Sequence, residues 1–239
     1  MSDTRPVGRG TAVGTVLAAA ILLTAAVLVV FSLRRPEPPT YAPTPPAPVE
    51  VGEQRVGPVV YAVDATDSDR WRYFDFSRGS VVERPRPLEW DLAFRRFHVI
   101  ANGGAGFPGA GGVLDMGAVP FDSVRSVPAH GYLGTEVDPD SINPGFGKWY
   151  DYGFTTHLLT PKGHVYAVRT ADGRFAKLEI LSYYCPGAQP GCITFRYVYQ
   201  GDGSTRVAAP ASTRSRPDPP ASPDHAPAPG VPRGAPSGA

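Results

Sequence analysis

The chain has 239 residues, of which 42% are hydrophobic and 19% are charged, and its formal net charge is +1. Its 23 Lys and Arg residues nearly balance 22 Asp and Glu residues and form no extended basic block, which argues against a nucleic-acid partner. Most of the 28 prolines lie in residues 36–48 and after residue 203, where few apolar side chains could build a core. We therefore expect one folded unit between two Pro-rich flanks.

An apolar run without charged residues occupies residues 12–33. At about 1.5 Å per residue, a helix of this length crosses a hydrocarbon core of about 30 Å. Arg34, Arg35 and Pro36 follow the run and make a poor cleavage site, so an uncleaved signal anchor is favoured over a removable signal peptide. No cysteine follows directly, which excludes lipoprotein attachment at this point. The run predicts a single transmembrane helix.

Apolar and polar residues alternate along the stretch from Leu88 to Gly104, as in a strand with one buried face. The alternation slips at the adjacent Arg95 and Arg96, which we interpret as a β-bulge that admits one extra residue. Asn102 and the glycine after it form a turn pair that ends the run. This stretch predicts the central strand of the domain.

Further strands are predicted in short runs divided by Gly and Pro, at residues 59–63, 71–77, 111–115, 121–127 and 149–159. Beyond the apolar run, no apolar i, i+3, i+4, i+7 pattern indicates an amphipathic helix. The sequence therefore predicts an all-β fold in a single antiparallel β-rich domain. The expected organisation is a short cytoplasmic amino terminus (1–11), a transmembrane helix (12–33), a Pro-rich linker (34–48), the β-domain (49–203) and a disordered Pro/Ala-rich tail (204–239).

The two cysteines, Cys185 and Cys192, flank a short Gly/Pro loop between two strand-like runs. If they lie opposite each other in an antiparallel hairpin, Ile180 faces Tyr197 and the apolar residues of both strands share one face. This register favours a disulfide over two free thiols, and the spacing matches no common metal site. A disulfide indicates an oxidising compartment and hence an extracytoplasmic domain, either periplasmic or at the cell surface.

A second hairpin is predicted about the turn at Asp172-Gly173, with Val165 opposite Ile180. It adds a third strand to the meander and extends the same apolar face. We expect the opposite face to be solvated and to hold an ion pair between Glu179 and Arg196, although a planar ligand would also suit it. That face carries His164, Tyr166, Glu179, Leu181, Tyr183, Thr194 and Arg196.

Residues 104–109 match the G-x-G-x-x-G pattern of dinucleotide sites. That motif binds a pyrophosphate only where a strand leads into a helix, and no helical pattern follows here, so we interpret residues 103–112 as a flexible surface loop. Nucleophile-elbow, zinc-protease and P-loop motifs are absent from the sequence. We therefore expect a protein that is not an enzyme.

Five sequence blocks follow one another in a fixed order: WRYFDFSRG with VV at 71–82, WDLAFRR with NG at 90–103, VP and GY at 127–132, VYAVRTADGRFAK at 165–177 and ITFRYVY at 193–199. Together they resemble the HmuY family, secreted or surface-held β-proteins whose founding members bind haem for iron acquisition. The resemblance implies a mostly β fold, in agreement with the strand pattern above. It also implies haem or a related tetrapyrrole as a ligand that is captured without catalysis.

The best-known members of this family hold the haem iron between two histidines. Here the segment that would carry the first, residues 133–148, contains no histidine, and Gly153 and Phe154 stand where the second would follow Trp149. Neither histidine ligand of the family is present at the corresponding position of this sequence. Since haem iron accepts His, Met, Tyr or Cys, four other residues are candidate ligands: His157, His130, His164 and Met116. Candidate partners for the propionates are Lys162 and Arg196.

A tight turn at Lys162-Gly163 would place His157 opposite Val168, on the same sheet face as His164. Two such histidines could then approach one iron. His130 instead lies beside the Gly-Tyr block at 131–132, and Met116 follows the Gly-rich loop.

The sequence thus predicts a membrane-anchored, extracytoplasmic HmuY-like protein with three kinds of partner: haem, the membrane through the amino-terminal helix, and a protein at the envelope. One alternative keeps the fold but not the cofactor, as a structural or protein-binding β-module that has lost the family's haem ligands. A second alternative, an enzyme of unrecognised type, would require a cleft with convergent carboxylates.

Overall fold

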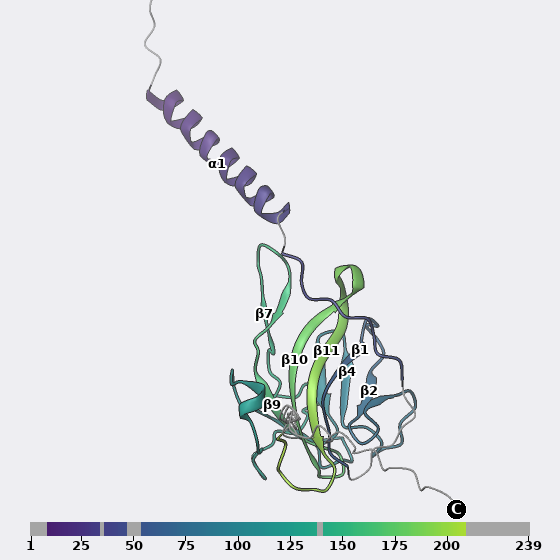
Figure 1. The fold of residues 1–239 in the computed structure, drawn as a ribbon. Helices are drawn as coiled ribbons and strands as arrows, with labels where there is room; N and C mark the ends of the chain where they lie inside the picture. Colours follow the sequence, from purple (N-terminus) through teal and green to yellow (C-terminus); the bar gives the residue numbers. More distant parts are fainter. Residues whose placement is uncertain (1–8, 34–35, 47–53, 138–140, 209–239) are drawn as a thin grey trace, which may run out of the picture. The chain divides into compact units, whose positions relative to one another are not determined.

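The computed structural model describes residues 9–33, 36–46, 54–137 and 141–208, and the predicted organisation at residues 1–8, 47–53 and 209–239 lies outside this range. Helix α1 (Arg9–Leu33) includes the segment Val13–Phe31, which is long and apolar enough to cross a membrane and is not buried against protein. The other described residues form strands and loops with two short 3-10 turns, η1 (Phe121–Ser123) and η2 (Pro186–Ala188), as Figure 1 shows. The predicted all-β fold class is confirmed.

Two antiparallel sheets and a separate hairpin form the β-domain. The larger sheet has the order β1 (Val56–Asp64), β11 (Gln189–Gln200), β10 (Phe175–Cys185), β9 (Val165–Arg169) and β6 (Gly112–Asp115). The smaller has the order β3 (Ser80–Val82), β2 (Arg72–Asp75), β4 (Leu92–Arg95) and β5 (His98–Ala101). The hairpin pairs β7 (Tyr150–Tyr152) with β8 (Leu159–Pro161). The long strands β10 and β11 run side by side through the middle of the domain (Figure 1).

Aromatic side chains from both sheets form the main core. Phe74 on β2 is fully buried, and its ring lies 4.9 Å from Tyr61, 5.2 Å from Phe195 and 5.7 Å from Tyr197, centroid to centroid. All three contacts are edge-to-face, the arrangement that aromatic quadrupoles favour. Since the partners lie on β1 and β11, this cluster joins the smaller sheet to the larger one.

The opposite face of the larger sheet is also covered. Phe121 of η1 is buried there against strands β9 to β11, in a second cluster with Val165 and Val198. The buried Lys177 donates hydrogen bonds of 2.7 Å to the carbonyls of Phe121 and Val124, and its ammonium lies 4.2 Å from the Phe121 ring. Burial lowers the pKa of Lys177. Its bonds hold the first residue of η1 and the residue that follows η1 against the sheet.

The predicted pair of Glu179 and Arg196 is confirmed, with nitrogen–oxygen distances of 2.6 and 2.7 Å. The guanidinium of Arg196 also lies 4.4 Å from the centre of the Phe121 ring. Phe121 therefore covers the part of the sheet for which a planar ligand was considered. The expectation of a solvated face is therefore wrong where η1 packs on the sheet.

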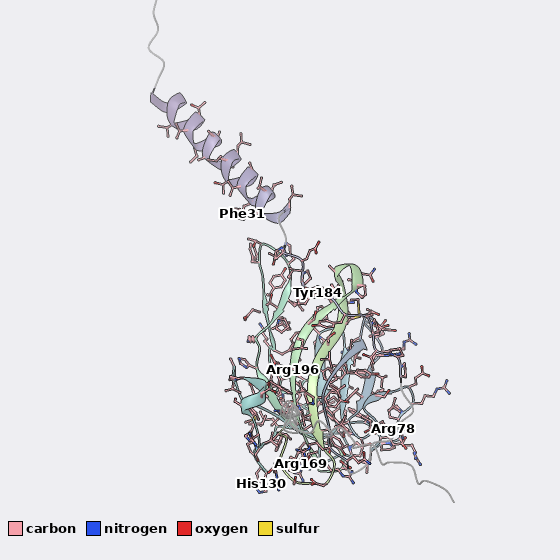
Figure 2. The ribbon with its side chains drawn as sticks, viewed as in Figure 1. Phe31, Arg78, His130, Arg169, Tyr184 and Arg196 are labelled. Carbon is pink, nitrogen blue, oxygen red and sulfur yellow. A yellow bond between two sulfur atoms is a disulfide. The ribbon has the colours of Figure 1, made fainter. Side chains whose placement is uncertain are left out.

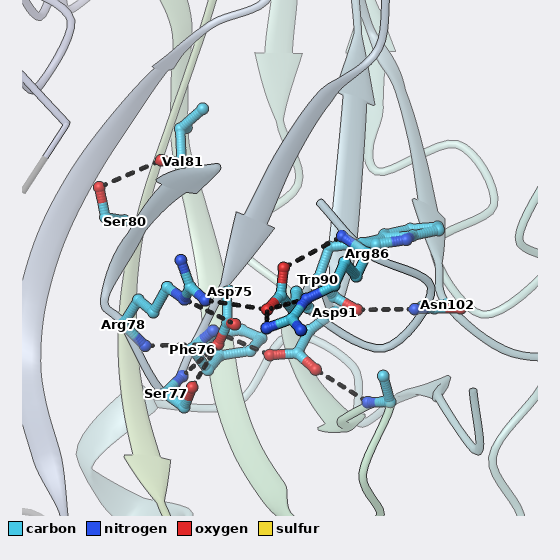
Figure 3. Close-up of polar contacts among 12 residues, drawn as sticks. Asp75, Phe76, Ser77, Arg78, Ser80, Val81, Arg86, Trp90, Asp91 and Asn102 are labelled. Carbon is cyan, nitrogen blue, oxygen red and sulfur yellow. Dashed lines mark hydrogen bonds and ion pairs between the residues drawn. The ribbon is translucent and has the colours of Figure 1, made fainter. Parts of the chain in front are cut away.

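The buried carboxyl of Asp91 connects the two sheets (Figure 3). One oxygen accepts a 2.8 Å hydrogen bond from the Phe76 amide after β2, and the other accepts a 2.8 Å bond from the Ala171 amide between β9 and β10. The backbone amide of Asp91 donates to Phe74, and its carbonyl accepts from Asn102. Burial, assisted by the nearby carboxylate of Asp75, raises the pKa of Asp91 to about 8, although the two amides act in the opposite direction.

The predicted central strand at residues 88–104 is wrong, because the chain reverses at Arg96. Residues 92–95 form β4 and residues 98–101 form β5, and the two strands pair as a hairpin with Arg95 opposite His98. Arg96 has a φ of 52°, in the left-handed region that non-glycine residues rarely adopt. Contacts from far along the chain hold it there: its amide donates to Ala65, and its guanidinium donates to Thr66 and Pro190. No local turn signal marks this reversal.

The hairpin about residues 172 and 173 is confirmed, but its register is shifted by one residue. Val165 lies opposite Glu179 instead of Ile180, because the loop has three residues between the paired Thr170 and Arg174. The extra residue, Ala171, is the one whose amide donates to Asp91. A shift by one residue exchanges the faces of β9, so Tyr166 and Val168 enter the main core.

The disulfide between Cys185 and Cys192 is confirmed, with the Cα atoms 4.9 Å apart. The register of β10 against β11 differs from the prediction by two residues from Phe175 to Ile180, so that Ile180 faces Phe195, and by three residues at Cys185, which faces Gln189. The register changes at irregularities in the strand pairing on either side of Ser182. A shift by two preserves the faces, and the apolar residues of both strands share one side as expected.

Two other predicted strands have different structures. Residues 121–127 begin with η1 and continue as an irregular segment, and residues 149–159 contain the turn of the β7–β8 hairpin. The turn that would have set His157 opposite Val168 therefore does not form, because β8 pairs with β7 and β9 pairs with β6 and β10. The predicted strands at 59–63, 71–77 and 111–115 correspond to β1, β2 and β6.

Both flanks contact the domain. In the segment expected as a linker, the amide of Tyr41 donates to Tyr184 on β10, and the carbonyl of Pro39 accepts from the Ser182 hydroxyl. Beyond residue 203, the carbonyl of Thr205 accepts from the amide of Val127, and Val207 is fully buried. We call residues 36–46 the strap.

Removal of the disulfide is expected to destabilise the domain. Replacing both cysteines with serine should lower the free energy of unfolding by about 2.5 kcal/mol, because the cross-link restricts a short loop in the unfolded chain. Urea unfolding followed by tryptophan fluorescence would measure this. Wild-type protein that is equally stable with and without a reductant would contradict the expectation.

The buried Asp91 carboxyl should make stability depend on pH. Its folded pKa of about 8 lies above the usual value of 3.8, so the unfolded chain loses this proton first and stability falls as pH rises from about 4 to 8. Arg86 lowers the pKa of Glu89 to about 2, so the change of stability with pH that is due to Glu89 lies below this window. Asp91→Asn should be less stable at pH 5 by about 1–3 kcal/mol, because its amide group cannot accept both hydrogen bonds.

Urea unfolding of wild type and Asp91→Asn at pH 5, 6, 7 and 8 would test this. The wild-type protein should lose stability across the series, and the variant should show a flatter profile. Parallel profiles would show that Asp91 does not titrate in this range.

Candidate functional site

His164 and Met116 lie near each other in sheet pairing but point to opposite faces. The Met116 amide donates to the Val165 carbonyl, and the Met116 side chain packs in the cluster around Phe121. The His164 ring lies 6.2 Å from the ring of Tyr166, which belongs to the main core, and its Nδ1 lies 2.8 Å from a carboxylate oxygen of Asp115. Since successive residues of a strand face opposite sides, these two candidates do not face a common ligand.

His157 and His130 lie on separate loops. His157 is in the turn of the β7–β8 hairpin with a φ of 56°, and its Nδ1 lies 2.5 Å from the Tyr152 hydroxyl. His130 is exposed in the loop after Val127, and Figure 2 shows it at the end of the domain opposite Tyr184. Neither residue lines the two cavities described next, nor do His164 and Met116. The structure thus brings no two of the four candidates into one of these cavities.

A cavity of about 340 Å³ lies beside the turn between β4 and β5. Its aromatic wall begins at the ring of His98, which packs 4.4 Å from the ring of Phe97, and continues to Tyr150, whose ring is 5.7 Å from that of Phe97. The cavity is lined by Phe97, His98, Val99, Ser141, Ile142, Asn143, Gly147, Lys148 and Tyr150. We call it the His98 cavity. It combines an imidazole, aromatic faces and a nearby cation.

Tertiary contacts assemble this cavity. The indole nitrogen of the buried Trp149 donates a 2.9 Å hydrogen bond to the Phe97 carbonyl, which joins the β4–β5 turn to the chain entering β7. Sequence reasoning missed His98 because it placed this residue inside one continuous strand. A turn recognised at Arg96 would have indicated that His98 lies beside a loop. That turn depends on contacts from residues 65, 66 and 190.

A second cavity of about 420 Å³ lies between the strap and strands β8 and β10. Its lining is mostly apolar: Pro36, Glu37, Pro38, Pro39, Leu158, Leu159, Thr160, Pro161, Gly163, Glu179, Ile180, Leu181, Ser182 and Tyr184. The Tyr184 hydroxyl accepts a 2.8 Å hydrogen bond from the Leu159 amide, which connects β8 to β10. We call this cavity the strap groove. It contains no histidine or methionine that could ligate haem iron.

The Gly-rich segment at residues 103–112 is a loop, as predicted, but it is tightly packed. A Cβ atom on Gly104, whose φ is 100°, would lie 2.4 Å from the Thr135 carbonyl oxygen, and one on Gly111 would lie 2.5 Å from that of Asn102. The glycines thus permit close approach of backbones. This explains the glycine spacing without a phosphate ligand. Within the described ranges, no group of three His, Cys, Asp or Glu side chains could hold a metal ion.

The family model described as HmuY protein matches residues 67–139 and 134–197, which is more than half of the chain. The chain belongs to the HmuY family. Among curated proteins, none matches it.

Two solved structures align with this chain over nearly their whole length. A Bacteroides vulgatus protein described as HmuY-like and heme-binding is 25% identical, with a TM-score of 0.48, and covers 63% of this chain and 98% of its own. The apo HmuY analog of Tannerella forsythia is 17% identical, with a TM-score of 0.49, and covers 62% and 98%. Both TM-scores are below 0.5, so the family assignment rests on the family model.

Proposed function

We propose that this protein captures haem or a related tetrapyrrole outside the cytoplasmic membrane, to which α1 anchors it, and that it does so without catalysis. Membership of the HmuY family is the observation that carries this proposal. The apolar helix supports a single membrane span at residues 12–33. The amino terminus, residues 1–11, would then be cytoplasmic if the domain lies outside. The Cys185–Cys192 disulfide supports an oxidising compartment for the domain, periplasmic or at the cell surface. The role would be iron acquisition.

The His98 cavity is the best-fitting site for haem among the described residues. The imidazole of His98 would ligate the iron, the rings of Phe97 and Tyr150 would pack on the macrocycle, and Lys148 would meet a propionate. The volume of about 340 Å³ is at the lower end for small-molecule pockets, so part of the macrocycle would remain exposed. His157, His130, His164 and Met116 are the alternative iron ligands.

A second candidate function is a haem-independent structural or protein-binding β-module at the envelope. It is favoured by a specific observation: none of the four alternative ligands lines the His98 cavity or the strap groove. The residues that follow Trp149 at the second family position, Gly153 and Phe154, also cannot ligate iron through their side chains. The two functions differ in whether the protein binds haem at all.

Absorbance titration of the purified protein with ferric haem distinguishes the two functions. We expect a saturable shift of the Soret band at about one equivalent in the wild type. His98→Ala should weaken binding by roughly tenfold or more, since loss of an iron–imidazole bond costs at least about 1.4 kcal/mol. His130→Ala removes an exposed imidazole outside both cavities and should bind as the wild type does, whereas weaker binding in this variant with His98→Ala unchanged would make His130 the ligand.

The same titration with His157→Ala, His164→Ala and Met116→Ala covers the alternative ligands. Weaker haem binding by one of these variants, with haem binding by His98→Ala unchanged, would show that the site is not the His98 cavity. Wild-type spectra equal to those of haem mixed with an unrelated protein would contradict haem binding and favour the protein-binding module.

A further inference from the structure

The connection between α1 and the β-domain is very short. The helix ends at Leu33, and Pro36 already lines the strap groove together with Leu158 of the β7–β8 turn. Three peptide steps reach at most about 10 Å. The rim of the strap groove therefore lies within about 10 Å of the end of α1, whichever way the helix points.

The strap is attached to this end of the domain by several bonds. The Ser182 hydroxyl donates to the Pro39 carbonyl, the Tyr41 amide donates a 3.0 Å bond to Tyr184, and the Thr44 amide donates a 2.9 Å bond to Ala62. Since the first of these bonds is made by Pro39, six residues after Leu33, the domain cannot move more than about 20 Å from the end of α1 without losing them. When α1 spans a membrane, the strap-groove end of the domain is thus the end nearest to the lipid.

Large aromatic side chains are exposed at the same end. The turn of the β7–β8 hairpin, residues 152–158, leaves 82% of Phe154 and 55% of Tyr152 accessible to solvent. We call this turn the hairpin tip. Since its last residue, Leu158, lines the strap groove with Pro36, the tip and the strap belong to one end of the domain. Figure 2 shows Tyr184, another groove residue, at the end opposite His130.

The hairpin tip is an ordered turn whose own contacts hold its backbone. The Gly153 amide donates a 2.8 Å bond to the Leu158 carbonyl, and the His157 amide donates a 2.7 Å bond to the Gly153 carbonyl. The Tyr152 hydroxyl lies 2.5 Å from Nδ1 of His157, and the Phe154 ring lies 6.5 Å from the His157 ring. A preformed turn loses little conformational freedom when its exposed side chains are buried against a surface.

We propose that the hairpin tip docks at the lipid–water interface of the membrane that α1 spans. Aromatic side chains favour this region, where an apolar ring meets lipid tails and a polar group remains in water. Phe154 would insert between headgroups, and Tyr152 would lie at their level. The interfacial layer on each side is about 5–8 Å thick, which is similar to the reach of the connection from α1. The proposal rests on the proposed membrane anchoring and is independent of haem.

Lipid quenching of a fluorophore at the tip tests this in the full chain. Thr155→Cys, at an exposed position beside Phe154, supplies one free thiol for an environment-sensitive dye, because the native cysteines form the disulfide. In phosphatidylcholine–phosphatidylglycerol vesicles, the emission should shift to the blue and be quenched by lipids with a nitroxide near the headgroup. Ala129→Cys, exposed beside His130 at the other end, is the matched control and should show neither effect.

A second pair of variants tests the side chain itself. A dye on Thr155→Cys should be quenched when Phe154 is present, and this quenching should be lost with Phe154→Asp, a change at a solvent-exposed position. Flotation of the vesicles separates the two proposals. Protein that floats but shows equal quenching at positions 155 and 129 overturns docking alone, and protein that does not float overturns both the anchor and the docking.

Discussion

The hydrogen bonds of Asp91 are the constraint on which most of this structure depends. A buried carboxyl is costly unless it has partners, and here both side-chain oxygens and both backbone groups of one residue have them. The partners come from the ends of β2 and β5 and from the loop between β9 and β10. This set of bonds joins the smaller sheet to the larger one beside the aromatic core, since Phe76, whose amide donates to Asp91, packs on Tyr197 and Tyr199. It also requires Ala171 to turn its amide inward, and that requirement sets the register of β9.

The register of β9 decides what each face of the larger sheet can do. With Tyr166 and Val168 in the main core, Val165 and Ala167 face the other way, where η1 and the segment up to Val127 cover them. The charged residues of that side are used internally, Lys177 for the carbonyls of η1 and Arg196 for Glu179. Most of both faces is therefore covered by the protein itself. The two cavities described above lie where this cover ends, the His98 cavity beside the β4–β5 turn and the strap groove beside β8 and β10.

The functional features assemble at these margins from distant parts of the chain. The His98 cavity joins residues 97–99 to residues 141–150, and the strap groove joins the chain after α1 to β8 and β10. Family membership supports the proposed capture of haem, for which the His98 cavity is the proposed site.

The sequence by itself determined the fold class, the apolar helix, the disulfide and most of the strands, because alternation, apolar length and cysteine spacing are local signals. It also indicated the family, because five sequence blocks resemble those of the HmuY family and follow one another in the same order. The tertiary structure alone decided the reversal at Arg96, the one-residue shift at Ala171 and the packing of the strap and of Val207. Each of these depends on a hydrogen bond or burial between residues far apart in the chain. The same holds for the candidate iron ligands. Residue type alone was enough to name His130, His157, His164 and Met116. His98 lines a cavity because contacts from Ala65, Thr66 and Pro190 hold the preceding turn in a conformation that the local sequence does not favour.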